Sequence, residues 1–256
     1  MVTAGHVLKP EHRLKPSTLW IHSKGGKWSR AVFEAADDHS DIGIAIVEDP
    51  HCETDAMTRN EIRFEPVEAL EPVVCSANTS HSDKFLVTSG LVASPRQTFS
   101  LTYADQPFGL IQIAMSILPG MSGAPLFDSN QKLCGMITKK YSEFGLAIPS
   151  NVLLAKVDQL IEDGHCKRRP FGIRFAQRLC LYPVNGSFRP GIELTSVDLD
   201  SLAYHGGLQS GDVILTVNGE PCMAPCDIIE STEIPIRVVR LEYLRGGVLL
   251  RSELRL

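Results

Sequence analysis

A serine enclosed by glycines is the feature that most constrains this sequence. The stretch 118–127 has the sequence Leu-Pro-Gly-Met-Ser-Gly-Ala-Pro-Leu-Phe, with Ser122 between Gly120 and Gly123. Glycine at position 120 permits a turn in which its N–H and that of Ser122 point to one spot beside the hydroxyl, as an oxyanion hole requires. The apolar pair 126–127 predicts a strand that would hold this turn rigid. Because serine is also a common turn residue, the stretch alone leaves a nucleophile and a plain turn equally open.

A reactive serine needs a general base and a carboxylate that orients the base. His6 follows a short run of apolar and small residues and is the candidate base. Asp41 immediately precedes the apolar run 42–47, so its carboxylate would be partly buried beside the imidazole. The chain order His6, Asp41, Ser122 is that of the chymotrypsin class, whereas α/β-hydrolases begin with the serine. The sequence therefore predicts a trypsin-like serine protease with these three catalytic residues.

Other residues of the right chemical type have weaker contexts. Neither of the two aspartates just before Asp41 adjoins the apolar strand, two further histidines lie in polar segments, and one His/Asp pair falls at a predicted helix end. These residues are Asp37, Asp38, His39, His51, Asp163 and His165. The hydrolase elbow is also excluded, since it needs glycine two residues after the nucleophile, where Ala124 stands.

Three segments resemble the active-site blocks of the HtrA/Deg protease family. They are Thr-Ala-Gly-His at 3–6, Asp-Ile-Gly-Ile-Ala at 41–45 and Pro-Gly-Met-Ser-Gly-Ala-Pro-Leu at 119–126. The resemblance extends from residue 1 to the C-terminus. It departs from the family at Met121 and Ala124, where asparagine and glycine are usual, and neither change removes a catalytic group. The resemblance implies that the N–H groups of Gly120 and Ser122 form the oxyanion hole.

The resemblance also implies the architecture, which is mainly β. We expect a chymotrypsin-like double β-barrel, its first barrel lacking the initial strands, followed by an α+β PDZ domain. The expected boundaries are 1–164 for the protease domain, 165–169 for a polar and basic linker and 170–256 for the PDZ domain. Many short strand patterns with turn signals agree with barrels. Apolar residues at helical spacing predict one closing helix over 150–163, with Ser150 as N-cap and Gly164 as its stop.

The position of His6 so near the first residue is unusual for this fold. The family resemblance implies that about two strands, and any signal or anchor segment, are absent here. Met1 is then not the true start, or the chain is a fragment, or its first barrel is shortened.

The primary substrate pocket is expected, from the resemblance, beside the serine loop. Its lining would include Ser116 and the strand Gly145, Leu146, Ala147 and Ile148. None of these is an acid that could pair with lysine or arginine, so cleavage after small or aliphatic residues is expected. A plain alternative is that these side chains only pack the second barrel. The edge of the strand 145–148 is a candidate for pairing with an extended substrate.

The last third of the chain carries the PDZ-like pattern. Phe171-Gly172-Ile173 resembles a carboxylate-binding loop, in which consecutive backbone N–H groups hold a peptide C-terminus. The segment 208–219 is the most family-specific and ends in an Asn-Gly hairpin signal. A docking domain with an occluded groove remains the alternative.

Composition excludes several other classes. The net charge of −5 and pI of about 5.9 provide no global footprint for nucleic acid. No apolar run approaches the roughly 20 residues needed to span a bilayer. The seven cysteines have neither disulfide-framework nor zinc-site spacing. The sequence indicates no metal and no organic cofactor.

By resemblance, the expected function is ATP-independent serine endopeptidase action on unfolded or misfolded proteins, with the PDZ domain binding peptide C-termini. Homo-oligomers are among the assemblies that the resemblance suggests, and a periplasmic or otherwise extracytoplasmic location is typical of the family. The alternative is a catalytically inactive or truncated homologue that serves as a PDZ peptide-binding module.

Overall fold

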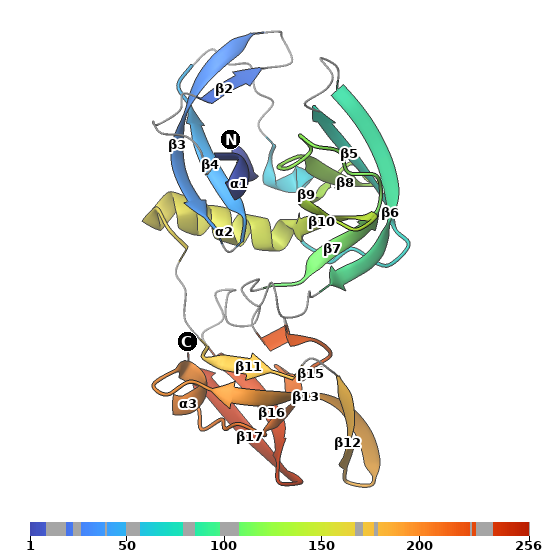
Figure 1. Ribbon diagram of the computed structural model, residues 1–256, viewed down its shortest axis with the longest axis vertical. Helices are drawn as coiled ribbons and strands as arrows, with labels where there is room; N and C mark the ends of the chain where they lie inside the picture. The colour runs from blue at the N-terminus through green and yellow to red at the C-terminus, as the bar shows by residue number, and fades with distance from the viewer. Residues whose placement is uncertain are drawn as a thin grey trace. The chain divides into compact units, whose positions relative to one another are not determined.

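The computed structural model describes residues 1–8, 19–22, 27–38, 40–49, 57–78, 85–97, 108–166, 171–176, 179–225, 227–228 and 238–255. The chain divides into two units. The first comprises Met1–Gln97 and Gly109–Cys166, and the second comprises Lys167–Leu256 with a short segment that ends at Phe108. Strands dominate both units (Figure 1), so the mainly β prediction is confirmed. His39 and His51 lie outside the described residues.

The first unit begins with an antiparallel sheet of four strands in the order β1-β4-β3-β2. These are β1 (Val2–Ala4), β2 (Leu19–His22), β3 (Trp28–Asp37) and β4 (Ile42–Val47), and the one-turn helix α1 (Gly5–Leu8) follows β1 directly. Leu8, Ala31 and Ala45 form a small buried core on one face. The apolar run after Asp41 is thus a strand, as the sequence predicts.

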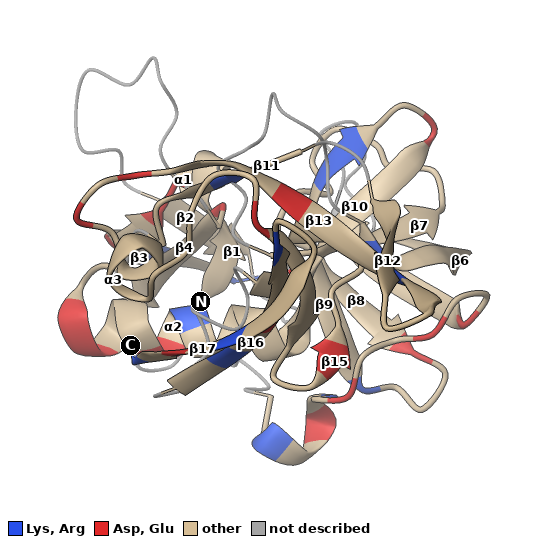
Figure 2. Cartoon of the chain, turned by 90° about the horizontal axis from the view of Figure 1, so that it is seen from below, with Lys and Arg blue, Asp and Glu red and all other residues tan. Residues whose placement is uncertain are grey.

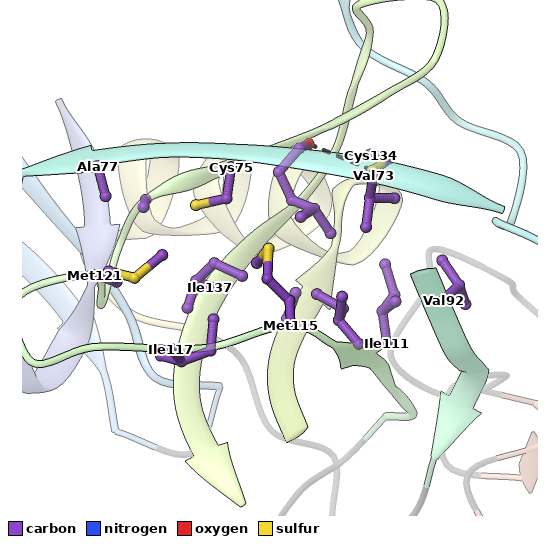
Figure 3. Packing of buried hydrophobic residues seen from close by; sticks show 14 of the residues in the cluster. Val73, Cys75, Ala77, Val92, Ile111, Met115, Ile117, Met121, Cys134 and Ile137 are labelled. Atoms are coloured by element: carbon purple, nitrogen blue, oxygen red, sulfur yellow. Dashed lines mark hydrogen bonds between the residues drawn. The ribbon is translucent and has the colours of Figure 1, made fainter. Parts of the chain in front are cut away.

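The other half of the first unit is a closed six-stranded barrel in the order β10-β7-β6-β5-β8-β9. Its strands are β5 (Pro72–Asn78), β6 (Phe85–Gln97), β7 (Leu110–Ala114), β8 (Pro125–Asp128), β9 (Leu133–Tyr141) and β10 (Phe144–Pro149), and a 3₁₀ turn, η1 (Arg59–Glu61), precedes them. Aliphatic side chains, methionines and two cysteines fill its interior (Figure 3). β8 is the rigid strand expected after the serine loop.

One expectation about the edge strands is wrong. β10 pairs with β7 on one side and with β9 on the other, so residues 145–147 present no edge to a substrate. Closure of the barrel consumes both edges of this strand. β9, by contrast, extends beyond its neighbour β8. Its pairing with β8 ends at Met136, whereas its pairing with β10 continues to Tyr141.

The helix α2 (Ser150–Asp163) has the predicted bounds and ends at Gly164 in the left-handed conformation. It contacts β3 and β4 of the open sheet as well as β9 and β10 of the barrel, so one helix packs on both sheets (Figure 1). The predicted N-cap is wrong by one residue. Pro149 occupies the cap position, and the Ser150 hydroxyl instead donates to the carbonyl of Arg63.

The second unit is built on a seven-stranded sheet. Its central order is β11 (Ile173–Phe175), β13 (Ser187–Val197), β14 (Val213–Val217), β16 (Val238–Arg245) and β17 (Val248–Arg255), with β12 (Cys180–Val184) on β13 and β15 (Glu220–Pro221) on β14. The predicted helical turn is α3 (Leu202–His205), capped by the Ser201 hydroxyl. β14 serves two cores, since Ile214 packs in one and its neighbours Val213 and Leu215 pack in the other.

Charged residues of both signs are interspersed along the strands and loops (Figure 2). Among the described residues, no helix is long and apolar enough to cross a bilayer. Five cysteines fall within the described part of the chain, and all five are free thiols.

Candidate active site

Pairing between β1 and β4 brings His6 to Asp41. The register sets Thr3 opposite Gly43 and Ala4 opposite Ile42, and the amide of Gly5 donates to the carbonyl of Asp41 at 2.8 Å. The next residue, His6, therefore starts beside the Asp41 side chain.

Asp41 holds His6 at two points. Its Oδ1 accepts from the backbone N–H of His6 at 2.9 Å, and Nδ1 of the ring lies 2.9 Å from both Oδ1 and Oδ2. The Asp41 side chain is 18% exposed and that of His6 is 52% exposed. A carboxylate on Nδ1 favours the tautomer that leaves Nε2 free to accept a proton.

The serine loop packs against the strand that leads to His6. A Cβ added at Gly123 would lie 2.1 Å from Oγ1 of Thr3, and the backbone there has φ of +86°. Only glycine allows this close approach. The N–H of Gly123 donates to the carbonyl of Ile137 at 2.7 Å, which fixes the loop to β9 as well. The glycine after Ser122 thus joins the barrel to the open sheet.

Thr138 connects the candidate nucleophile Ser122 to Asp41. It is fully buried in β9, its Oγ1 donates to Oδ2 of Asp41, and its carbonyl accepts from the Ser122 hydroxyl at 3.2 Å. Among the described residues, the Ser122 hydroxyl makes no direct hydrogen bond to His6. Thr138 was not among the residues expected at the site, because its bond to Asp41 joins positions 97 apart in the sequence.

Backbone amides of the serine loop fall into two groups. Those of Met121, Gly123 and Ala124 donate to carbonyls, whereas, within the described chain, those of Gly120 and Ser122 donate to none. Gly120 has φ of +98°. An oxyanion hole needs two such N–H donors, here that of Ser122 itself and that of Gly120, two residues before it.

The two departures from the family pattern are interior positions. Met121 is fully buried and Ala124 is 8% exposed, and both belong to the barrel core (Figure 3). The sulfur of Met121 also accepts from the amide of Leu118 at 3.2 Å. These side chains therefore point away from the solvent side of the loop. This explains why methionine fits at position 121 in place of asparagine and alanine fits at position 124 in place of glycine.

The expected pocket residues differ in exposure. Leu146, Ala147 and Ile148 are at most 1% exposed, and Gly145 is buried against the side chain of Ile117, where a Cβ would approach to 2.6 Å. Ser116 alone is exposed. The strand thus contributes its side chains to the barrel, and only its backbone and Ser116 remain for contact with a substrate.

Other residues that could serve as nucleophile, base or orienting acid make contacts of their own outside the candidate triad. Burial raises the pKa of the Cys75 thiol to about 11 and that of Cys134 to about 12, so both are protonated and unreactive near neutral pH. Nδ1 of His165 lies 2.9 Å from the carbonyl of Asp163 at the end of α2. Asp37 accepts from the amide and hydroxyl of Ser40.

A cleft of about 560 Å³ lies elsewhere on the first unit, lined by Arg63, Glu65, Glu68, Ala69, Leu70, Glu71, Asp128, Asn130 and Lys132. Its central ion pairs join Arg63 to Glu71 and to Asp128. Asp128 also accepts from the amides of Asn130 and Lys132. The charged groups at the centre of this cleft thus partner one another, and no candidate catalytic residue lines it.

In the second unit, the candidate carboxylate loop is tightly built. Phe171 is 6% exposed in the main core, and Gly172 has φ of +71°. A Cβ at Gly172 would lie 2.1 Å from that of Ser201. Within the described chain, the amides of Phe171 and Gly172 donate to no backbone carbonyl. Ile173 begins β11, which lies at the end of the sheet order and pairs with β13.

The fold and the site define a trypsin-like peptidase domain with a PDZ domain after it. Residues 1–136 match the family model of the trypsin-like peptidase domain, and residues 193–235 match that of the PDZ domain. The chain belongs to the trypsin-like peptidase family, and its combination of domains is that of the HtrA-type proteases.

Named relatives agree with this assignment. A probable periplasmic serine endoprotease DegP-like of Pseudomonas putida is 33% identical over 63% of this chain and 35% of its own length. The serine protease Do-like HtrA of Lactobacillus helveticus is 23% identical over 84% of this chain and 56% of its own length. The chain thus spans between about a third and just over a half of these relatives. The solved HtrA-type protease AlgW with tripeptide has the same fold, with a TM-score of 0.68 at 21% identity, covering 99% of this chain and 84% of that one.

Proposed function

We propose that this chain is an ATP-independent serine endopeptidase that cleaves unfolded or misfolded proteins. The observation that carries the proposal is the contact of His6 Nδ1 with both carboxylate oxygens of Asp41, at 2.9 Å. The serine loop supports it, since Gly123 packs against Thr3, three residues before His6. The relatives named serine proteases add to this support.

The proposed reaction is acyl transfer to water. The Ser122 hydroxyl leaves the carbonyl of Thr138, gives its proton to Nε2 of His6 and attacks the substrate carbonyl carbon. Asp41 keeps the second imidazole proton on Nδ1 and stabilises the imidazolium. The N–H groups of Gly120 and Ser122 receive the oxyanion. The protonated imidazole then delivers its proton to the leaving amine, and water hydrolyses the acyl-enzyme by the same steps in reverse.

We further infer the finer assignments from the same residues. Cleavage follows small or aliphatic residues, because the groups that remain for substrate contact, Ser116 and the backbone of the strand 145–148, include no acid for a basic side chain. The protease domain covers 1–164 and the PDZ domain covers 170–256.

We also infer a location outside the cytoplasm, because several relatives are named periplasmic.

Covalent labelling of Ser122 is the direct test. A fluorophosphonate, which reacts with activated serines, is expected to label the wild-type protein and not Ser122→Ala. Ser129→Ala, which removes an exposed serine just after β8, should leave labelling and casein digestion unchanged. Sequencing of the casein products is expected to show small or aliphatic residues before the cut. Products that end mainly in lysine or arginine would contradict the pocket assignment.

An inactive peptide-binding homologue is the second candidate. It is favoured by one observation, the bond of the Ser122 hydroxyl to Thr138 rather than to His6. Equal inertness of wild type and Ser122→Ala towards both fluorophosphonate and casein would decide for this candidate.

For the PDZ domain we propose capture of apolar peptide C-termini by the amides of residues 171–173. A peptide with a free carboxylate is expected to bind at least about 10-fold more tightly than its C-terminal amide, because the amide removes the charge that these N–H groups bind. Fluorescence anisotropy with both peptides measures this ratio. Equal affinities would indicate an occluded or unrelated groove. Changing the peptide is cleaner than changing Gly172, since any side chain there collides with Ser201 and disturbs the fold.

A further inference from the structure

Met121 is attached to the serine loop through its backbone and through its side chain. Its N–H donates to the carbonyl of Leu118 at 3.1 Å, and its carbonyl accepts from the amide of Ala124 at 3.0 Å. Its sulfur accepts from the amide of Leu118 at 3.2 Å. Leu118 and Met121 are thus joined in both directions, once through the backbone and once through the thioether.

The two residues between them form the turn that carries a candidate oxyanion donor. Proline at position 119 and glycine at position 120 with φ of +98° are typical of the centre of a type II turn, which the bond from Met121 to Leu118 closes. Types I and II differ by a rotation of the peptide plane between the two central residues. Because the Gly120 N–H lies in that plane, its direction depends on how the turn is held.

The side chain of Met121 fixes this turn to the barrel. It is fully buried and belongs to the same core as Ala77, Ile117 and Ile137, whereas positions 118–120 are exposed (Figure 3). Exposed turns rearrange easily, while a close-packed interior leaves a side chain little freedom. The thioether therefore links the exposed turn to a rigid part of the fold.

We propose that Met121 is a positioning residue for the oxyanion hole. Its buried sulfur holds the amide of Leu118, and the turn that this contact closes keeps the Gly120 N–H in the direction that the oxyanion requires. The proposal rests on the proposed endopeptidase function and adds to it a residue that touches neither the substrate nor the reacting atoms. Leucine fills a similar volume in a core but cannot accept a hydrogen bond, so it separates the sulfur from the packing.

Met121→Leu tests this role, with Met115→Leu as the matched control. Met115 belongs to the same core and is 5% exposed, but it lies outside the turn. Met121→Leu is expected to lower kcat by about 5- to 20-fold, a part of the roughly 10²- to 10³-fold that loss of a whole oxyanion donor costs, and to leave KM within about 2-fold. Affinity for a peptide boronic acid, whose tetrahedral adduct places an oxygen in the oxyanion hole, should fall by the same factor as kcat. Met115→Leu should leave kcat, KM and this affinity within about 2-fold of wild type.

The amide signal of Gly120 tests the anchor without any hydrolysis. Labelling proline carbonyls with ¹³C and glycine with ¹⁵N selects Pro-Gly pairs, of which the sequence has two, at 119–120 and 190–191. In Met121→Leu the Gly120 signal is expected to broaden or split, because the turn then exchanges between conformations. The signal of Gly191, in β13 of the second unit, should stay single and sharp, and Met115→Leu should leave both signals so.

The outcomes separate this proposal from the hydrolytic one. Equal kcat for the two leucine variants, or a Gly120 signal that stays single and sharp in Met121→Leu, overturns the role of Met121. A wild-type protein that neither reacts with fluorophosphonate nor cleaves casein, together with a Gly120 signal that splits only in Met121→Leu, would refute the endopeptidase and leave the anchoring of the turn standing.

Discussion

Asp41→Asn is expected to lower kcat/KM for peptide hydrolysis by about 10⁴-fold, close to the loss seen when a triad aspartate is replaced by its amide in other serine proteases. The amide cannot hold Nδ1–H as the carboxylate does, so the imidazole loses the tautomer that accepts a proton at Nε2. The hydroxyl of Thr138 would also lose its charged acceptor. Active-site-titrated protein and steady-state kinetics on one peptide measure the effect.

Asp37→Asn is the matched control for that variant. Asp37, four residues before Asp41, is 7% exposed and accepts from the amide and hydroxyl of Ser40. Its replacement should lower the stability of the turn, by about 1 to 3 kcal/mol for a charged acceptor, and leave kcat/KM of the folded enzyme within a few-fold of wild type. A larger kinetic loss for Asp37→Asn than for Asp41→Asn would reverse the assignment of the triad acid.

Asp41 also illustrates what sequence can provide. Its place immediately before an apolar run predicted that it lies at a strand end, and that local pattern separates it from Asp37 and Asp38. The serine loop was equally visible, because glycines at 120 and 123 mark special backbone whatever the rest of the chain does. Local signals of this kind survive because they depend on neighbours in sequence.

Thr138 and β10 illustrate what sequence could not provide. The bond between Thr138 and Asp41 joins residues 97 apart, and no local pattern near either predicts it. The supposed edge at 145–148 failed for the same reason, since only barrel closure decides that β10 has neighbours on both sides. The side chains of that strand then became core rather than pocket lining. Both results depend on long-range pairing, which periodicity does not encode.

Asp212→Ala is expected to lower the free energy of unfolding of the second unit by about 2 to 4 kcal/mol, at the lower end of the cost of breaking a buried ion pair. Asp212 is fully buried and binds Arg245 through two contacts of 2.7 Å, and it also accepts from the amide of Gln209 at 2.8 Å. The variant removes the acceptor of the Gln209 amide and the carboxylate partner of the guanidinium, which keeps its bond to the carbonyl of Gly207. The cost is reduced because Arg245, one-third exposed, can regain water.

Both tryptophans, Trp20 and Trp28, lie in the first unit, so their fluorescence does not report on this loss. Hydrogen exchange of peptides from β14 and β16, followed by mass spectrometry, is the suitable measurement, and exchange there should accelerate by about 30- to 1000-fold under conditions where exchange follows the unfolding equilibrium. Glu253→Ala removes the exposed partner of Arg240, where both side chains are more than half exposed. Because surface pairs are typically worth under about 1 kcal/mol, this control should change exchange by less than about 5-fold. Similar exchange in the two variants would mean that the buried carboxylate does not hold the sheet to the turn at 207–212, and that packing in the two cores alone stabilises this unit.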